Sequence, residues 1–298
     1  MSNRFGGYLL PKLKIPDEEV KILLHTAKDD LASAEREFAA ENYHETISSL
    51  TQSIEKGSKS FFSYFDIVNS NKLKKEVGHL PTKGFEKSVD NIERGYKTVE
   101  AHISEIEWKE TREIPKFDIQ KVEPNKREIK NLLSTISKNP SRFMTIRNKD
   151  MTKIISQLKN IQIDLEVTRQ KIDNDDSYLT NIDDFQKDVF EVLKRQKIKP
   201  EIVEMIKVGS ILFYEVFDST YSIKDKAIVL HNIVNLTVTF LLLGFITQPH
   251  AISSRYPPKN FYTSKNILIK NFSEMQMITK NALNDMEEIF RISEKNAA

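Results

Sequence analysis

The chain has 298 residues, of which 39% are hydrophobic and 30% charged, so it carries enough apolar material for one large or two smaller folded domains. It contains 8 glycines, 10 prolines and no cysteine, which disfavours a many-turned β-sandwich or barrel and excludes disulfide frameworks, cysteine-ligated metal sites and thiol catalysis. A formal net charge of +2 gives no overall attraction to nucleic acid or to a membrane. This composition predicts an all-α protein built as an antiparallel helical bundle.

Two helices are predicted near the N-terminus, joined at the short Glu41–Asn42 junction. The first follows Asp17, a suitable N-cap, and its apolar residues recur at helical spacing. The second carries small or apolar residues at alternating intervals of four and three: Tyr43, Ile47, Leu50, Ile54, Gly57 and Phe61. Such seams are typical of antiparallel pairs, so we expect a hairpin, with a close approach to another helix at Gly57.

A third helix with the same seam is expected from Thr82 to Ile106. Three antiparallel helices leave a shared apolar groove, which a later helix must close. We therefore group 17–108 as the N-terminal helices of the bundle.

The segment 109–182 is expected to be an insertion or linker. Lys116–Val122 and Ile161–Val167 alternate with a period of two, which allows a small β-ribbon; the preferred reading is an irregular linker followed by a helix. Its first part, 109–159, holds 13 basic and 6 acidic residues, and an acidic run follows from Asp173 to Asp188. The two surfaces could dock on each other or face different partners.

Helices return from Asp183, and we assign 183–298 to the helices that complete the bundle. The most apolar stretch, Ala227–Thr247, has His231, Asn232 and Asn235 near its start, which leaves too short an unbroken run to span a membrane. It is predicted to be a buried core helix, followed by a loop from Thr247 to Tyr262 and a final helix. No secretory signal precedes Pro16, so we expect a cytoplasmic protein without membrane attachment.

Most familiar catalytic and cofactor motifs are missing from the sequence. The six histidines do not form a metal-binding helix pattern. Neither a glycine-rich phosphate loop nor a Gly-x-Ser-x-Gly elbow occurs. We therefore expect no metal and no cofactor.

Three polar spots are the candidates for function. Glu55 and Lys59 are spaced to pair on one helix, His79 and Lys83 flank a helix start, and Arg255 and Tyr256 follow the most apolar helix. Each has a structural alternative: an exposed salt bridge, a capping or packing histidine, and a seal for the end of the bundle. We predict that all six side chains line one pocket. The candidates for a catalytic role are His79, His250 and Arg255.

Together these pieces resemble the HEPN superfamily of helical bundles, found in prokaryotic toxin–antitoxin and abortive-infection systems. The matching pieces are the helix with Ala27, Leu31, Ala34 and Glu35, the Glu55-Lys56-Gly57-Ser58-Lys59 segment, the Gly78-His79-x-x-x-Lys83 junction and the Arg255-Tyr256-Pro257 loop. The nearest subgroup is the AbiV type. The resemblance covers about residues 20–106 and 200–290.

HEPN ribonucleases carry an Arg-x(4–6)-His motif, in which arginine steadies phosphate and histidine does acid–base work. This chain departs from it: Arg36 and His44 are too far apart, as are Arg94 and His102, and no histidine follows Arg255. The resemblance then implies a non-catalytic or divergent member that binds nucleotide, RNA or a partner protein.

Three hypotheses follow. The first is a binding protein of phage defence or toxin–antitoxin pairing, acting as a homodimer or with an antitoxin or nucleotidyltransferase partner. The second is a divergent metal-independent endoribonuclease, with His79 or His250 as general base and Arg255 holding phosphate. The third is a purely structural helical scaffold.

Overall fold

A computed structural model describes residues 13–79, 83–85, 87, 148–174, 182–196, 203, 221–255 and 262–297. The part that it describes is 88% helical and contains no strand, which confirms the all-α prediction. Its elements are α1 (Glu18–Ala39), α2 (Tyr43–Tyr64), the 3-10 turn η1 (Ser70–Lys72), α3 (Leu73–Glu76), α7 (Asn148–Asn174), α8 (Ile182–Arg195), α10 (Ile223–Arg255) and α11 (Tyr262–Ala297).

The two N-terminal helices form the predicted hairpin. The Asp17 carboxylate accepts a hydrogen bond from the backbone N–H of Val20 at 2.9 Å and so caps α1, as expected. Glu41 reverses the chain with a φ of 59°. Small side chains on α2 then tie it to α1: Ser53 donates to the carbonyl of Ala27 at 2.7 Å, and Ser60 donates to that of Val20 at 3.0 Å.

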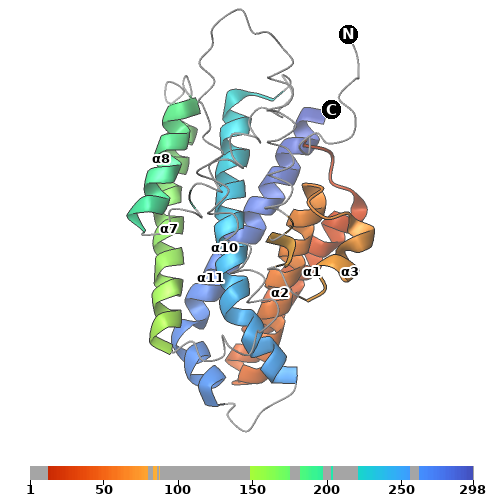
Figure 1. The fold of residues 1–298 in the computed structure, drawn as a ribbon, viewed down its shortest axis with the longest axis vertical. Helices are drawn as coiled ribbons and strands as arrows, with labels where there is room; N and C mark the ends of the chain where they lie inside the picture. The colour runs from red at the N-terminus through yellow and green to blue at the C-terminus, as the bar shows by residue number, and fades with distance from the viewer. Residues whose placement is uncertain are drawn as a thin grey trace, which may run out of the picture.

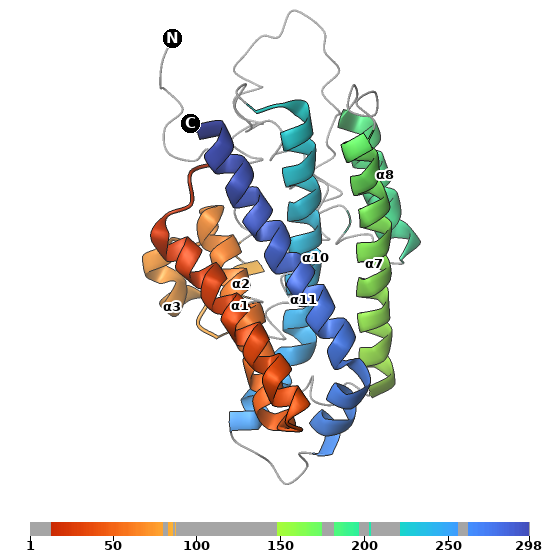
Figure 2. The same cartoon turned by 180° about the vertical axis from the view of Figure 1, so that it is seen from behind.

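Helix α11 lies antiparallel against α1 (Figure 2). Polar contacts along its length fix the register, because Lys21 pairs with Glu294, Lys28 with Glu287, and Glu35 accepts a hydrogen bond from Gln276. Inside this rim the apolar faces of both helices are buried.

Helix α10 runs through the centre of the molecule, between α2 and α11 on one side and α7 with α8 on the other (Figure 1). Among the described residues Ile223–Gly244 is one stretch long and apolar enough, by length and composition, to cross a membrane, and 89% of its most apolar window is buried inside the protein. The prediction of a buried core helix at this point is confirmed.

The α1–α2 hairpin and the α10–α11 pair share one hydrophobic core. They approach closely at Gly57 of α2, where an added Cβ would lie 2.8 Å from the Leu283 side chain and 2.9 Å from the Phe240 ring. Gly57 therefore sits at the close helix contact that its place in the seam predicted.

The β-ribbon that the alternation allowed does not form at Ile161–Val167, which is part of helix α7, in agreement with the other reading of a linker followed by a helix. The period of two misled because Ile163 and Val167, the residues that completed the alternation, are about half exposed on the outer face. The buried face follows helical spacing instead: Leu158, Ile161, Leu165, Thr168 and Ile172. The companion segment Lys116–Val122 lies outside the described residues.

The predicted loop from Thr247 also begins too early, because α10 continues to Arg255. Pro249 removes one backbone donor from the helix but does not end it. Thr247 is buried, and its hydroxyl donates to the carbonyl of Leu243 within the same helix at 2.8 Å. Most of the expected helix from Thr82 to Ile106 lies outside the described residues, although Lys83–Phe85 is helical.

Candidate functional site

Three of the six predicted pocket residues meet at one carboxylate. The Glu55 side chain accepts hydrogen bonds from the Lys59 ammonium, 2.6 Å from Oε1, and lies 3.1 and 3.2 Å from Nδ1 of His79. The side chains of Glu55 and Lys59 are only 10% and 14% exposed, whereas that of His79 is 72% exposed. The pair on α2 is thus not an exposed salt bridge but a buried one with a histidine at its outer edge.

The local fold explains why His79 reaches α2. After α3, the backbone N–H groups of Val77 and Gly78 both bond the carbonyl of Leu73, which closes a tight turn. Gly78 takes a φ of 61°, in the left-handed region that glycine enters without strain. The next residue, His79, is thereby directed back to Glu55.

The orientation of the His79 ring has chemical consequences. With Nδ1 held by a carboxylate, Nε2 lies on the opposite edge of a mostly exposed ring. A ring fixed in this way can accept a proton at Nε2 when neutral, or donate a hydrogen bond to an anion when protonated. Lys59 supplies a permanent positive charge beside it.

Lys83 lies next to this site along the chain. The segment Lys83–Phe85 packs on α2, because Gly84 lies flat against the Phe62 ring and the Phe85 ring is 4.9 Å from it. Lys83 is half-buried at the start of this segment.

The predicted residues Arg255 and Tyr256, and the catalytic candidate His250, belong to the end of α10 and to the chain that follows it. Arg255 is the last residue of α10, and His250 lies one turn earlier in that helix. The side chains of both lie outside the described part of the protein, and so does all of Tyr256. The single six-residue pocket therefore stays a prediction.

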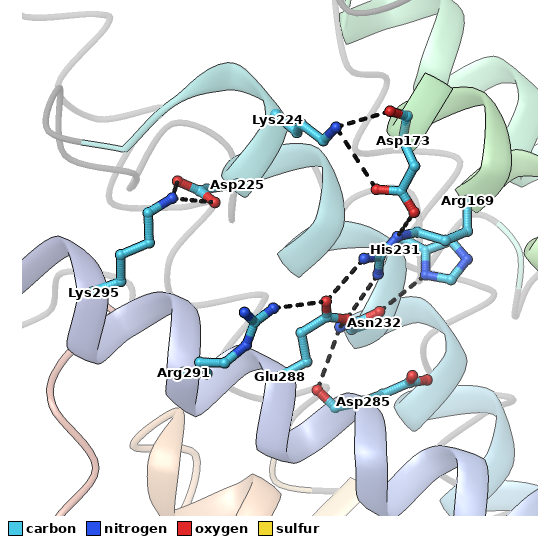
Figure 3. Close-up of polar contacts among 10 residues, drawn as sticks. All are labelled: Arg169, Asp173, Lys224, Asp225, His231, Asn232, Asp285, Glu288, Arg291 and Lys295. Carbon is cyan, nitrogen blue, oxygen red and sulfur yellow. Dashed lines mark hydrogen bonds and ion pairs between the residues drawn. The ribbon is translucent and has the colours of Figure 1, made fainter. Parts of the chain in front are cut away.

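A second polar cluster, which the sequence argument did not select as a site, joins three helices. It consists of Arg169 from α7, His231, Asn232 and Asn235 from α10, and Asp285 and Glu288 from α11. We call it the three-helix polar cluster; Figure 3 draws its members other than Asn235.

A bidentate ion pair lies at the centre of this cluster. The two terminal nitrogens of Arg169 donate to the two oxygens of Glu288 at 2.7 and 2.8 Å, and Nε donates to Asp173 at 3.0 Å. The hydrogen bonds from Arg169 lower the pKa of Glu288 to about 2, and the same carboxylate raises the pKa of Arg169.

The imidazole of His231 is buried between two acceptors. Its Nε2 lies 2.9 Å from the Leu165 carbonyl on α7, and its Nδ1 lies 3.0 Å from Oδ1 of Asn232. The Asn232 amide nitrogen in turn donates to Glu288 at 2.9 Å and to the backbone carbonyl of Asp285 at 3.3 Å. Burial lowers the pKa of His231.

Asp285 is the second unusual carboxyl group. It accepts a hydrogen bond from the Asn235 amide at 2.5 Å. Burial raises its pKa to about 7, against the lowering effect of that hydrogen bond, and the neighbouring Glu288 charge adds to the increase.

The sequence did contain a signal for this cluster. His231, Asn232 and Asn235 interrupt an otherwise apolar helix, and buried polar groups need partners. What the sequence could not supply was the identity of those partners, which come from α7 and α11. In the part of the chain that the structure describes, no group of three or more histidine, aspartate or glutamate side chains is placed to hold a metal ion.

Comparison of the chain with family models, with curated proteins and with solved structures returned no match.

Proposed function

We propose that this protein is a HEPN-like binding module whose Glu55–Lys59–His79 site takes a phosphate group of a nucleotide or of RNA. The observation that carries the proposal is the buried Glu55 carboxylate, which holds an ammonium and an exposed imidazole side by side. The resemblance of the sequence around these residues to the HEPN superfamily supports the same reading. Its place in phage defence or toxin–antitoxin pairing, and its pairing as a homodimer or with an antitoxin or nucleotidyltransferase, are part of this proposal.

The charge balance of the site favours an anionic ligand. Lys59 and Glu55 neutralise each other, and His79 can donate a further hydrogen bond from its exposed edge. Lys83 follows His79 by four residues in the chain, and we include it among the basic residues of this site. A phosphate oxygen is an acceptor that suits both an imidazolium and an ammonium.

The test is binding of ATP and of a labelled single-stranded RNA, measured by calorimetry and by fluorescence anisotropy at two salt concentrations. His79→Ala and Lys59→Met should each weaken binding about tenfold or more, because a hydrogen bond to a charged group contributes ~1.5–3 kcal/mol. Affinity for RNA should also fall with added salt.

The matched control is His25→Ala. His25 also faces a carboxylate, with Nδ1 3.3 Å from Asp29, but it lies on the exposed surface of α1. Binding should be unchanged in this variant. If neither ligand binds, or if the His79 and Lys59 variants bind as well as the native chain, the Glu55 cluster is a structural feature of a helical scaffold and the proposal fails.

A second candidate function is a metal-independent endoribonuclease. It is favoured by one observation, the carboxylate on Nδ1 of His79, since a histidine oriented in this way can serve as a general base. Gel analysis of the RNA recovered from the binding reactions, made in the presence of a chelator, separates the two. Cleavage that His79→Ala abolishes would support the nuclease, and intact RNA would support binding alone.

A further inference from the structure

The contact between Glu55 and His79 decides which nitrogen of the imidazole carries a proton. Nδ1 lies 3.1 Å from Oε1 and 3.2 Å from Oε2 of the same carboxylate. Oε1 is also 2.6 Å from the Lys59 ammonium, so Glu55 is one half of an ion pair, and an ionised carboxylate only accepts hydrogen bonds. Nδ1 must therefore be the donor, whatever the charge of the ring.

The neutral form of the ring is thereby limited to one tautomer. A neutral imidazole carries a single N–H, and in His79 that proton is on Nδ1. Nε2 then presents a lone pair, on the outer edge of a side chain that is 72% exposed. A phosphate oxygen is also an acceptor, so a neutral His79 has no hydrogen bond to donate to it.

The charge of the site leads to the same requirement. The charges of Lys59 and Glu55 cancel, so with a neutral ring the three side chains have no net charge. One further proton, at Nε2, supplies both the missing donor and a net positive charge. Histidine is the side chain that ordinarily gains or loses a proton near neutral pH.

We propose that Glu55 is a positioning residue, which holds His79 in the Nδ1–H tautomer so that a phosphodiester binds at Nε2 only with uptake of one proton from solvent. The inference rests on the proposed function and adds how that site is regulated, because affinity for RNA then rises as the pH falls. The general-base role of the second candidate function needs the neutral ring instead, so cleavage would have the opposite pH dependence.

Other charged groups lie on the elements beside the ring. On α3 and in the segment that follows His79, they are Lys74, Lys75, Glu76, Lys83 and Lys87. Glu76 lies 3.8 Å from Lys87, and Lys56 of α2 pairs with Asp30 of α1 at 2.6 Å. Among the described residues, Glu55 is therefore the carboxylate that fixes the ring.

The proton uptake can be counted by calorimetry of oligouridylate binding to the full chain at pH 8, in two buffers that differ in their enthalpy of ionisation. The phosphodiesters keep one fixed negative charge at this pH, so a proton taken up goes to the protein. An ordinary histidine is neutral at pH 8. We expect uptake of about one proton at the site, and an affinity that falls up to about tenfold between pH 7 and pH 8.

The matched control for this count is His25→Ala. The His25 ring also faces a carboxylate, that of Asp29, but on the exposed surface of α1. The variant should take up the same number of protons as the native chain.

Glu55→Gln tests the positioning role itself. A glutamine can turn its amide nitrogen toward Nδ1, which makes Nδ1 the acceptor and leaves the ring proton on Nε2. The neutral ring can then donate to phosphate, so the uptake should fall well below one proton. A purely structural role of Glu55 would leave the proton count unchanged.

Nitrogen-15 NMR of the native chain without ligand reads the tautomer directly and should show Nδ1–H. Binding without proton uptake, an Nε2–H tautomer in the free chain, or an unchanged uptake in Glu55→Gln would each overturn the inference and leave the proposed function in place. Absence of binding from pH 6 to 8 would remove both together. If Glu55→Gln does not fold, the proton count and the tautomer of the native chain decide.

Discussion

At the scale of single residues, Gly57 shows how one missing side chain sets the spacing of three helices. It lies in the middle of α2, where glycine is intrinsically unfavourable relative to alanine. Glycine is nevertheless suited to this position, because Leu283 of α11 and Phe240 of α10 occupy the space that a Cβ would need. The close approach also brings Ile54 and Phe61, one turn on either side, into full burial.

We expect Gly57→Ala to lower the free energy of unfolding by about 1–3 kcal/mol, because overpacking at 2.8–2.9 Å outweighs the gain in helix propensity. Urea unfolding followed by circular dichroism measures this. Ser49→Ala, at a less buried position of the same helix, is the control and should change the stability little. An alanine variant as stable as the native chain would show that the contact relaxes freely.

Asn232 is the second residue on which many contacts depend. Its amide group joins His231, Glu288 and the backbone of Asp285, and it is fully buried. An amide offers both donors and an acceptor, which no apolar residue of similar size can replace.

Asn232→Ala should destabilise the protein by about 2–4 kcal/mol, since it leaves more than one buried polar group without a partner. Asn281→Ala is the matched control: it also removes an amide contact between α11 and α7, but at an exposed position. Thermal unfolding of both variants checks the difference. If the two variants are destabilised equally, the burial of the Asn232 contacts does not increase their contribution to stability.

At the scale of elements, the two helix starts of the hairpin differ in the way they are capped. Asp17 accepts a hydrogen bond from the first turn of α1, and Glu18 and Glu19 follow it at the positive end of the helix. Asn42 precedes α2 but makes no side-chain cap; its amide donates to Glu37 instead.

Asp17→Ala should therefore cost about 1 kcal/mol of stability, and Asn42→Ala clearly less. Chemical unfolding of the two single variants makes the comparison directly. If Asn42→Ala is the more harmful change, the bond to Glu37 contributes more to the junction than a cap contributes to α1.

At the scale of the whole molecule, polar contacts rather than apolar ones select how α7 sits on the bundle. An apolar stripe can slide along another, whereas the fork of Arg169 fits Glu288 in one register. Gln162 repeats the constraint two turns away, where it donates to the Ile278 carbonyl.

This ion pair predicts how the protein responds to acid. The pKa of Glu288 falls from 4.5 to about 2 in the fold, so its contribution to stability is present above pH 4.5 and is lost as the pH falls toward 2. Arg169→Met should lower the free energy of unfolding by ~1–3 kcal/mol near neutral pH, and solvent screening of the partly exposed pair favours the lower end of this range. The loss of stability at acid pH should also become less steep in this variant.

Arg291→Met provides the control at the same carboxylate. Arg291 is 3.4 Å from Glu288 but 76% exposed, so its removal should have a much smaller effect. Stability measured from pH 2 to 7 for the three proteins tests the prediction. If Arg169→Met loses stability at acid pH as steeply as the native chain, other carboxylates are responsible for that loss.

The sequence by itself determined the helical class, the α1–α2 hairpin, the Asp17 cap and the buried character of α10. Each of these features depends on the spacing of apolar and polar residues within a single segment of the chain. It also anticipated the pairing of Glu55 with Lys59, because four residues make one turn.

Only the tertiary structure decided which helices supply partners to one another. The alternation in Ile161–Val167 is compatible with a strand as well as with a helix, because the sequence does not show which face α10 and α11 cover. Ile163 and Val167 are apolar like their buried neighbours, so their exposure could not be predicted from this segment alone. The meeting of His79 with Glu55 depends on a turn at Gly78, and Arg169, Asn232 and Glu288 are brought together from three helices. Contacts between residues far apart in the chain follow from packing, and that information is not contained in the periodicity of any single segment.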